Sequence, residues 1–189
     1  MTEPRQTNCI VVIGYNGTGK TTVVSSLLAK MLSQGNRILI VTPDDREYNS
    51  VPYLDIENHP NLLQTFKGIT KTIFLEKFTI QAIRDHFTNG VVVFEDCRAY
   101  FGSVTDQELH SLLIRRRQMM IDIVAVAHGF TEVPRKFFTF SSHIVLFHTK
   151  DNIKARKDVL RNFDKMQHEQ IQVNVESLKN PHYYKIIRQ

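Results

Sequence analysis

The stretch GYNGTGKT, residues 14–21, decides the fold of this chain because it completes the phosphate-binding pattern G-x-x-x-x-G-K-[ST]. An apolar, β-branched stretch typical of a strand, residues 9–13, comes just before it. Residues 22–32 follow it and carry apolar side chains at helical spacing. In this context of strand, glycine loop and helix, the pattern binds a chain of phosphates. The sequence therefore predicts a nucleoside triphosphate site.

The residues of the loop have different expected tasks. Glycines allow backbone N–H groups to wrap around the β-phosphate, and the N-terminus of the following helix adds positive potential. Lys20 is expected to reach the β- and γ-phosphates, and the hydroxyl of Thr21 is expected to ligate Mg²⁺. The residues predicted to bind the nucleotide are Gly14, Tyr15, Asn16, Gly17, Thr18, Gly19, Lys20, Thr21 and Thr22.

The composition is that of a soluble globular protein of about one domain. The chain has 189 residues, of which 42% are hydrophobic and 23% are charged. Residues 1–8 lack the apolar core of a signal peptide, and no apolar run is long enough to span a membrane. Cys9 and Cys97 are expected at opposite edges of a parallel sheet, where they cannot form a disulfide. These features indicate a reducing, cytoplasmic compartment.

The net charge of +5 is unevenly distributed along the chain. Positive residues gather at 115–117, at 135–136 and along 150–165. Such clusters favour a polyanionic partner such as nucleic acid, although a mildly basic surface without such a partner fits the net charge as well.

Apolar stretches alternate with amphipathic segments along most of the chain. The predicted strands cover residues 8–13, 37–42, 91–94, 121–127 and 143–147, and residues 183–187 could add a last strand. The predicted helices cover residues 20–33, 77–88, 105–118, 133–140 and 153–167. Residues 49–76 stay ambiguous because prolines interrupt them, and residues 72–75 could form a short edge strand. The pattern predicts an α/β fold of three layers in a single domain, with a central, mostly parallel β-sheet.

Two adjacent carboxylates, Glu95 and Asp96, follow the predicted strand at residues 91–94. A strand in this position delivers them to the carboxyl edge of the sheet, beside the glycine loop. There one carboxylate can hold Mg²⁺, and its neighbour can orient or deprotonate the attacking water. By position, Glu95 is the predicted metal ligand and Asp96 the predicted catalytic residue. The alternative is a pair of solvated loop acids, but a pair in this place favours hydrolysis of the nucleotide.

Two further features can act on the terminal phosphate. The three arginines at 115–117 end the helix before the strand at 121–127, and one of them can reach a neighbouring subunit's γ-phosphate as an arginine finger. Alternatively, all three are solvated side chains at the negative end of the helix. His128 follows that strand, where it can either face the γ-phosphate or serve as a structural histidine. The other histidines have no metal-ligand spacing, so no metal beyond Mg²⁺ is predicted.

Over residues 8–148 the chain resembles the FtsK–HerA superfamily of P-loop DNA-pumping ATPases. It looks most like the compact viral branch, which includes genome-packaging ATPases and zonular-occludens-toxin-like phage proteins. The segments that carry the resemblance are the glycine loop, the strand and turn at 38–48, FEDCRAYF at 94–101, LLIRRRQ at 112–118 and AHGFTEVP at 127–134.

The resemblance implies a RecA-like P-loop fold with ATP and Mg²⁺ as cofactors, the metal being held by Thr21 and Glu95. Arg117 matches the family's arginine that acts on the neighbouring subunit, and His128 stands where the family has a sensing glutamine. The acidic pair is Glu-Asp here, whereas the family usually has Asp-Glu. The residues implied in catalysis are Lys20, Glu95, Asp96, Arg117 and His128.

The resemblance further implies an ATP-hydrolysing DNA translocase that packages a viral or phage genome as a homo-oligomeric ring, a pentamer or a hexamer. The ring would contact the DNA backbone, with capsid or membrane-vertex proteins as further partners, in the host cytoplasm or the virion. Residues 1–150 would form the ATPase core, and residues 151–189 a basic helix and a strand that pack on the same domain or extend it. Two alternatives stay open: a small-molecule or nucleoside kinase, and a nucleotide switch or assembly factor.

Overall fold

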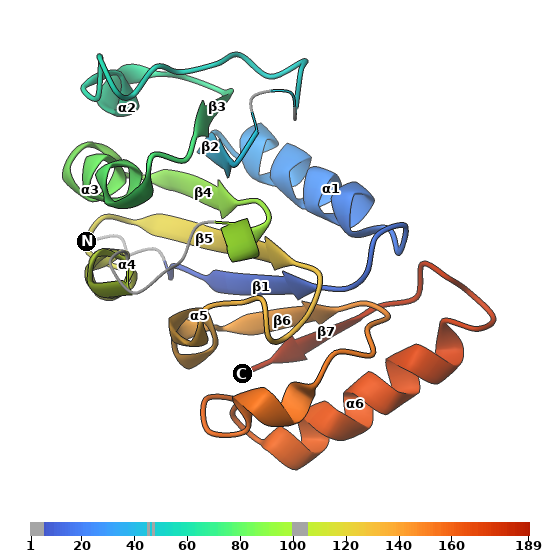
Figure 1. Ribbon diagram of the computed structural model, residues 1–189. Helices are drawn as coiled ribbons and strands as arrows, with labels where there is room; N and C mark the ends of the chain where they lie inside the picture. Colours follow the sequence, from blue (N-terminus) through green and yellow to red (C-terminus); the bar gives the residue numbers. More distant parts are fainter. Residues whose placement is uncertain (1–5, 45, 47, 100–105) are drawn as a thin grey trace.

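Seven strands form one sheet in the computed structural model, which describes residues 6–44, 46, 48–99 and 106–189 (Figure 1). Their order across the sheet is β3-β2-β4-β5-β1-β6-β7. All neighbouring strands are parallel except β6 and β7, which are antiparallel. The strands are β1 (Cys9–Ile13), β2 (Arg37–Thr42), β3 (Ile69–Ile73), β4 (Gly90–Phe94), β5 (Ile121–Ala127), β6 (His143–Leu146) and β7 (Lys185–Arg188).

Helices cover both faces of the sheet and give the fold three layers (Figure 1). On one face, α1 packs Val24 and Leu28 into a core with strand residues such as Val12. On the other face, α3, α4, α5 and α6 enclose a larger core that includes Phe137 and Phe138. The helices are α1 (Lys20–Ser33), α2 (Leu62–Thr65), α3 (Glu76–His86), α4 (Asp106–Arg115), α5 (Arg135–Phe140) and α6 (Phe163–Glu176), with 3-10 turns η1 (Cys97–Ala99) and η2 (Ile153–Arg156).

The predicted fold class is confirmed: the chain is a single α/β domain with a mostly parallel central sheet. Strands covered on both faces are apolar along nearly their whole length, and β5, with the sequence IDIVAVA, is buried throughout. Because this continuous apolar pattern is visible in the sequence, the predicted bounds of β1, β2, β4, β5 and β6 lie within one residue of the observed ones.

Residues 49–76, which the sequence left ambiguous, contribute α2 and the edge strand β3. β3 begins three residues before the expected stretch at 72–75 and pairs in parallel with β2. Its central residues, Thr70, Lys71 and Thr72, are buried although they are polar. The sequence ITKTI therefore has neither the apolar run nor the apolar alternation by which a strand is recognised.

The prediction of a basic helix at residues 153–167 is wrong in both the position and the charge of the helix. Residues 153–156 form only the 3-10 turn η2, and a helix begins ten residues later than expected, after Asn162 in the left-handed conformation at φ 53°. The basic side chains of 150–161 lie mostly in turns, whereas α6 itself carries three acids and one lysine. β7 follows α6 and joins the sheet beside β6. The functional division of the chain at residue 150 stays a prediction.

Both cysteines are buried free thiols, as expected. Cys9 begins β1 and Cys97 follows β4, so they lie at opposite edges of the sheet. Burial raises the pKa of the Cys97 thiol well above its ordinary value and that of Cys9 to about 12. Within the described ranges, no helix has the length and apolar character needed to cross a bilayer.

Candidate active site

The glycine loop leaves the carboxyl end of β1 and leads directly into α1. Its first residue, Gly14, lies so close to β6 that a Cβ built on it would be 2.4 Å from the Cβ of Phe147. Gly19 has φ 93°, a left-handed conformation that glycine adopts without strain. Backbone hydrogen bonds from Gly14 N to Ala127 O (3.3 Å) and from Tyr15 N to His148 O (3.0 Å) hold the start of the loop to the end of β5 and to the chain after β6. The neighbouring strands thus fix the position of the loop.

Lys20 is held at the base of the loop with only 7% of its surface exposed. Its ammonium donates to the carbonyl oxygens of Gly14 and Tyr15, the latter at 2.9 Å, and lies 3.5 Å from Nδ1 of His128. Burial lowers the pKa of Lys20, and the nearby carboxylates of Glu95, Glu132 and Asp96 oppose that shift. Three acids therefore share the surroundings of one lysine.

Glu95 and Asp96 follow β4 with different environments. The hydroxyl of Tyr48 donates to Oε1 of Glu95, and the backbone N–H of Glu95 donates to Val41 O at 3.0 Å. Asp96 has φ 46°, a left-handed conformation that non-glycine residues adopt infrequently and mostly in functional or turn positions. Its Oδ1 is buried and has no hydrogen-bond partner among the described residues. Because a buried carboxylate oxygen requires a partner, Asp96 is suited to hold a water or a ligand.

A cavity of about 740 Å³ lies at the carboxyl ends of β1, β4 and β5 and joins these groups. It is lined by Asn16, Gly17, Gly19, Lys20, Thr21, Thr22, Tyr48, Glu95, Asp96, Val126, Ala127, His128 and His182. Of the predicted loop residues, Gly14, Tyr15 and Thr18 lie outside this lining, and the hydroxyl of Thr18 donates to Tyr15 O at 2.7 Å. The structure therefore brings Lys20 together with both predicted acids and with His128.

The residues around this cavity fit a magnesium ion bound with a nucleotide. Mg²⁺ takes oxygen ligands and is commonly held by one or two protein groups together with substrate phosphates and water. Thr21 and Glu95 line the same cavity and offer a hydroxyl and a carboxylate, and Asp96 lines it as well. In the described part of the chain, no three acidic, histidine or cysteine side chains are arranged to hold a metal ion by themselves, and a site that shares Mg²⁺ with phosphates does not need them.

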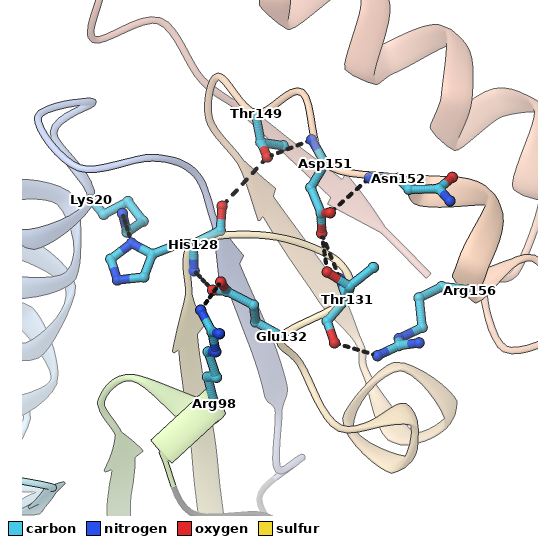
Figure 2. Close-up of polar contacts among 9 residues, drawn as sticks. All are labelled: Lys20, Arg98, His128, Thr131, Glu132, Thr149, Asp151, Asn152 and Arg156. Carbon is cyan, nitrogen blue, oxygen red and sulfur yellow. Dashed lines mark hydrogen bonds and ion pairs between the residues drawn. The ribbon is translucent and has the colours of Figure 1, made fainter.

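His128 and Glu132 link the loop after β5 to Lys20, as Figure 2 shows. The backbone N–H of His128 donates to Oε2 of Glu132 at 3.1 Å, and Arg98 lies 3.3 Å from Oε1 of the same carboxylate. The ring of His128 points toward Lys20. A displacement of Lys20 or of His128 would therefore alter the contacts that hold the loop at 128–134.

A segment after β6 holds this loop from the other side (Figure 2). Oδ2 of Asp151 accepts hydrogen bonds from the backbone N–H of Thr131 (2.6 Å) and from its hydroxyl (2.8 Å). The hydroxyl of Thr149 donates to His128 O at 3.4 Å and accepts from the N–H of Asp151 at 3.2 Å. A Cβ built on Gly129 would lie 2.4 Å from Oδ2 of Asp151, so only glycine fits against this carboxylate.

The same segment is in turn fixed to α6. The Gln170 amide donates to Thr149 O and Asp151 O at 3.1 and 3.0 Å, and Asn174 exchanges two hydrogen bonds with Thr149. Arg156 donates to Thr131 O at 2.6 Å. Residues beyond 150 therefore support the loop that carries His128 and Glu132.

Arg117 lies at the opposite edge of the sheet from Lys20. It lines a second cavity of about 510 Å³ at the amino ends of β1, β5 and β6, which also holds Arg161 and Arg188. Of the three consecutive arginines, Arg116 is buried and donates to Leu113 O at 2.7 Å, whereas Arg115 and Arg117 are exposed. Because β5 alone separates the two edges by about 20 Å, Arg117 cannot reach the nucleotide cavity of its own chain.

Three cavity or loop residues were not identified as site residues from the sequence. Tyr48 and Glu132 lie in segments that carry the family resemblance, so their positions gave a signal. The sequence did not show, however, that Tyr48 contacts Glu95 or that Glu132 accepts from the backbone N–H of His128. His182 lies beyond the region of resemblance, and nothing in the sequence around it indicates a site. It reaches the cavity only because β7 returns the chain to the sheet.

Comparison with known sequences gives little information. The chain matches no known protein-family model. A stretch of 49 residues, 26% of the chain, is 39% identical to the signal recognition particle receptor FtsY of Metamycoplasma hominis. This match spans only 14% of the receptor and does not assign the whole chain to a family.

Solved structures of similar fold cover most of the chain. The genome-packaging NTPase B204 of Sulfolobus turreted icosahedral virus 2, in complex with AMP, has a TM-score of 0.70 at 9% identity, with 96% of this chain and 92% of that chain covered. The DNA-packaging ATPase B204 of Sulfolobus turreted icosahedral virus has a TM-score of 0.68 at 11% identity, with coverages of 96% and 97%. The pCW3 conjugation coupling protein TcpA has a TM-score of 0.55 at 13% identity over 85% of this chain and 54% of its own. These likenesses confirm the predicted resemblance at the level of the fold.

Proposed function

We propose that this protein is an ATP-hydrolysing motor that moves DNA, acting as a homo-oligomeric ring in the packaging of a viral or phage genome. The observation that carries the proposal is the single cavity in which Lys20 of the glycine loop meets Glu95, Asp96 and His128. A site that only bound a nucleotide with Mg²⁺ could use Glu95 alone, so the second acid, Asp96, is the one that favours hydrolysis. Packaging ATPases among the structures of similar fold support the choice of a DNA motor.

The groups of the cavity divide the hydrolytic reaction among themselves. Backbone N–H groups of the loop and the ammonium of Lys20 bind the phosphates, while the carboxylate of Asp96, which lines the cavity, orients the attacking water. Thr21 and Glu95 would hold Mg²⁺, which neutralises phosphate charge when bound. Glu95 is kept in position by the hydroxyl of Tyr48. His128 lies where it can respond to the γ-phosphate and pass that response to the loop at 128–134.

Arg117 acts on the nucleotide of a neighbouring subunit. It is exposed at the amino edge, about 20 Å from its own nucleotide cavity, so it contributes to catalysis only if another subunit presents its carboxyl edge. A repeated contact of one edge with the opposite edge of the next copy is heterologous and closes into a ring when the rotation permits. Such an arrangement favours the ring over an isolated subunit.

Exposed positive side chains after β6 are the proposed contacts to the DNA backbone. Lys154, Arg161 and Lys165 are exposed in the segment between β6 and the first turn of α6. The overall charge of +5 supports a polyanionic partner. Contacts of this kind make binding independent of DNA sequence and strongly dependent on salt.

The test is phosphate release from ATP measured with and without double-stranded DNA, beside a native mass measurement with a non-hydrolysable ATP analogue. We expect release that DNA stimulates and a closed oligomer of five or six subunits. A phosphorylated product in place of free phosphate, on addition of nucleosides, would identify a kinase. Slow turnover that is indifferent to DNA would identify a nucleotide switch or assembly factor. Either outcome would overturn the proposal of a DNA motor.

A further inference from the structure

His182, in the segment between α6 and β7, forms part of the wall of the nucleotide cavity although it comes from the last eight residues of the chain. Its ring lies against the glycine loop: a Cβ built on Gly19 would be 3.2 Å from its Nδ1. In Figure 1 this segment, drawn in red, runs beside the loop that joins β1 to α1. His182 is exposed and lines the cavity, so its side chain is accessible to a ligand there.

The strand order shows which part of a nucleotide His182 faces. Glu95 and Asp96 follow β4 and His128 follows β5, and both strands lie on one side of β1. β6 and β7 lie on the other side of β1, and His182 precedes β7 by three residues. A triphosphate held by the loop at its β-phosphate, with its γ-phosphate at the acids and His128, directs its nucleoside away from β4 and β5. The nucleoside then lies on the side of His182.

The segment that carries His182 is held in place by several contacts. The backbone N–H of His182 donates to Oδ1 of Asn180 at 3.0 Å. Further along the chain, Tyr184 stacks on Phe147 with ring centroids 5.0 Å apart, and Phe147 is the residue that packs against Gly14. At the beginning of the segment, the hydroxyl of Ser177 lies 2.8 Å from Nδ1 of His148. These contacts position the segment and the backbone of His182 before a ligand arrives, which reduces the entropy lost on binding.

We propose that His182 stacks on the nucleobase and that the end of the chain thereby completes the nucleotide site. The proposal rests on the nucleotide-binding part of the proposed function and is independent of DNA movement. A planar imidazole that is exposed in the cavity wall is suited to stacking on a base, and such stacking tolerates different bases. His182 therefore adds affinity for the nucleoside and contributes little to the choice between ATP and GTP.

The test compares the binding of ATP with that of inorganic tripolyphosphate, which has the phosphates but no nucleoside. Calorimetric titrations with Mg²⁺ present would use the wild type, His182→Ala, His182→Phe and His59→Ala, a matched exposed histidine on a distant segment. We expect His182→Ala to weaken ATP and GTP about tenfold each and to leave tripolyphosphate within about twofold of the wild type. His182→Phe keeps a stacking ring and is expected to retain affinity for ATP, and His59→Ala is expected to bind as the wild type does.

Each other result of these titrations would overturn the inference. Equal losses for ATP and tripolyphosphate would mean that His182 supports the glycine loop or touches phosphate. Loss of ATP affinity in both the alanine and the phenylalanine variants would mean a polar contact rather than stacking, and unchanged affinity would mean no contact. A wild type that binds neither ligand would overturn the nucleotide site as well. A wild type that binds ATP but shows no DNA-stimulated hydrolysis would overturn only the proposed motor, because the comparison of ligands would still stand.

Discussion

Replacing Asp151 by alanine is expected to lower both the stability of the fold and the turnover of ATP, because this carboxylate holds the loop of His128 and Glu132. The side chain accepts three hydrogen bonds, two from Thr131 at 2.6 and 2.8 Å and one from the N–H of Asn152 at 2.8 Å. Hydrogen bonds to a charged group contribute about 1.5–3 kcal/mol each when buried. Water can replace part of these partly exposed bonds, so the total loss is expected to be about 2 kcal/mol.

The effect of Asp151→Ala on catalysis differs from its effect on binding. The variant leaves the loop at 14–21 intact, so the KM for ATP is expected to change little. The kcat is expected to fall about tenfold, because the His128 and Glu132 groups near Lys20 are no longer fixed. Urea denaturation and steady-state kinetics measure the two quantities.

Asp158→Ala is the matched control for this experiment. Asp158 lies in the same segment and pairs with Arg135, but its side chain is 58% exposed. Exposed ion pairs contribute little to stability, so this variant is expected to lose at most about 1 kcal/mol and to keep its turnover. If Asp151→Ala were as stable and as active as Asp158→Ala, the proposed support of the catalytic loop from beyond residue 150 would be refuted.

Three further predictions concern packing, pH and DNA. Gly14→Ala places a Cβ 2.4 Å from that of Phe147, so it is expected to destabilise the fold by about 2 kcal/mol in urea denaturation; an unchanged midpoint would contradict this packing. Burial raises the pKa of Cys9 from 9.0 to about 12, so its neutral thiol stabilises the fold below pH 9 and this contribution is lost as the pH rises toward 12, by at most about 1.4 kcal/mol per pH unit. Cys9→Ala should flatten the fall of unfolding free energy across that range, and an identical slope would refute the assignment. The triple variant Lys154→Ala/Arg161→Ala/Lys165→Ala should reduce the slope of log affinity for DNA against log salt concentration by about 0.9 per lost phosphate contact. The control variant Lys30→Ala, on α1, should keep the wild-type slope. A triple variant with the wild-type slope would exclude this segment as the DNA contact.

The parts of the fold that could be predicted are those whose burial is recorded in the local sequence. β5 is apolar except at Asp122 because helices cover both of its faces, and the glycine loop requires particular residues at fixed spacing. The sequence allows an edge strand only at residues 72–75, and the first residues of β3 could not be predicted because its polar centre is buried by tertiary packing that no local pattern records. The helix at 163–176 was misplaced because the chain between residues 157 and 162 turns, and Asn162 in the left-handed conformation precedes the helix.

The candidate site likewise has a part that could be predicted from the sequence and a part that could not. Lys20, Glu95 and Asp96 follow strands whose ends meet at one edge of a parallel sheet, so their approach could be inferred from strand positions alone. The partnership of Tyr48 with Glu95, the bond between His128 and Glu132, and the position of His182 depend on how loops fold onto one another. Such contacts either join residues that are distant in sequence or depend on the conformation of a turn. The hydrophobic periodicity of the sequence carries no information about them.

An ATPase assay on a mixture of two variants, Asp96→Asn and Arg117→Ala, tests the central claim most directly. Each variant alone is expected to be nearly inactive, because each lacks one half of every shared site. In a mixed ring, some cavities keep Asp96 and face the Arg117 of the neighbouring subunit, so an equal mixture is expected to recover about a quarter of wild-type turnover. A mixture no more active than either variant alone would contradict an active site shared between neighbouring subunits.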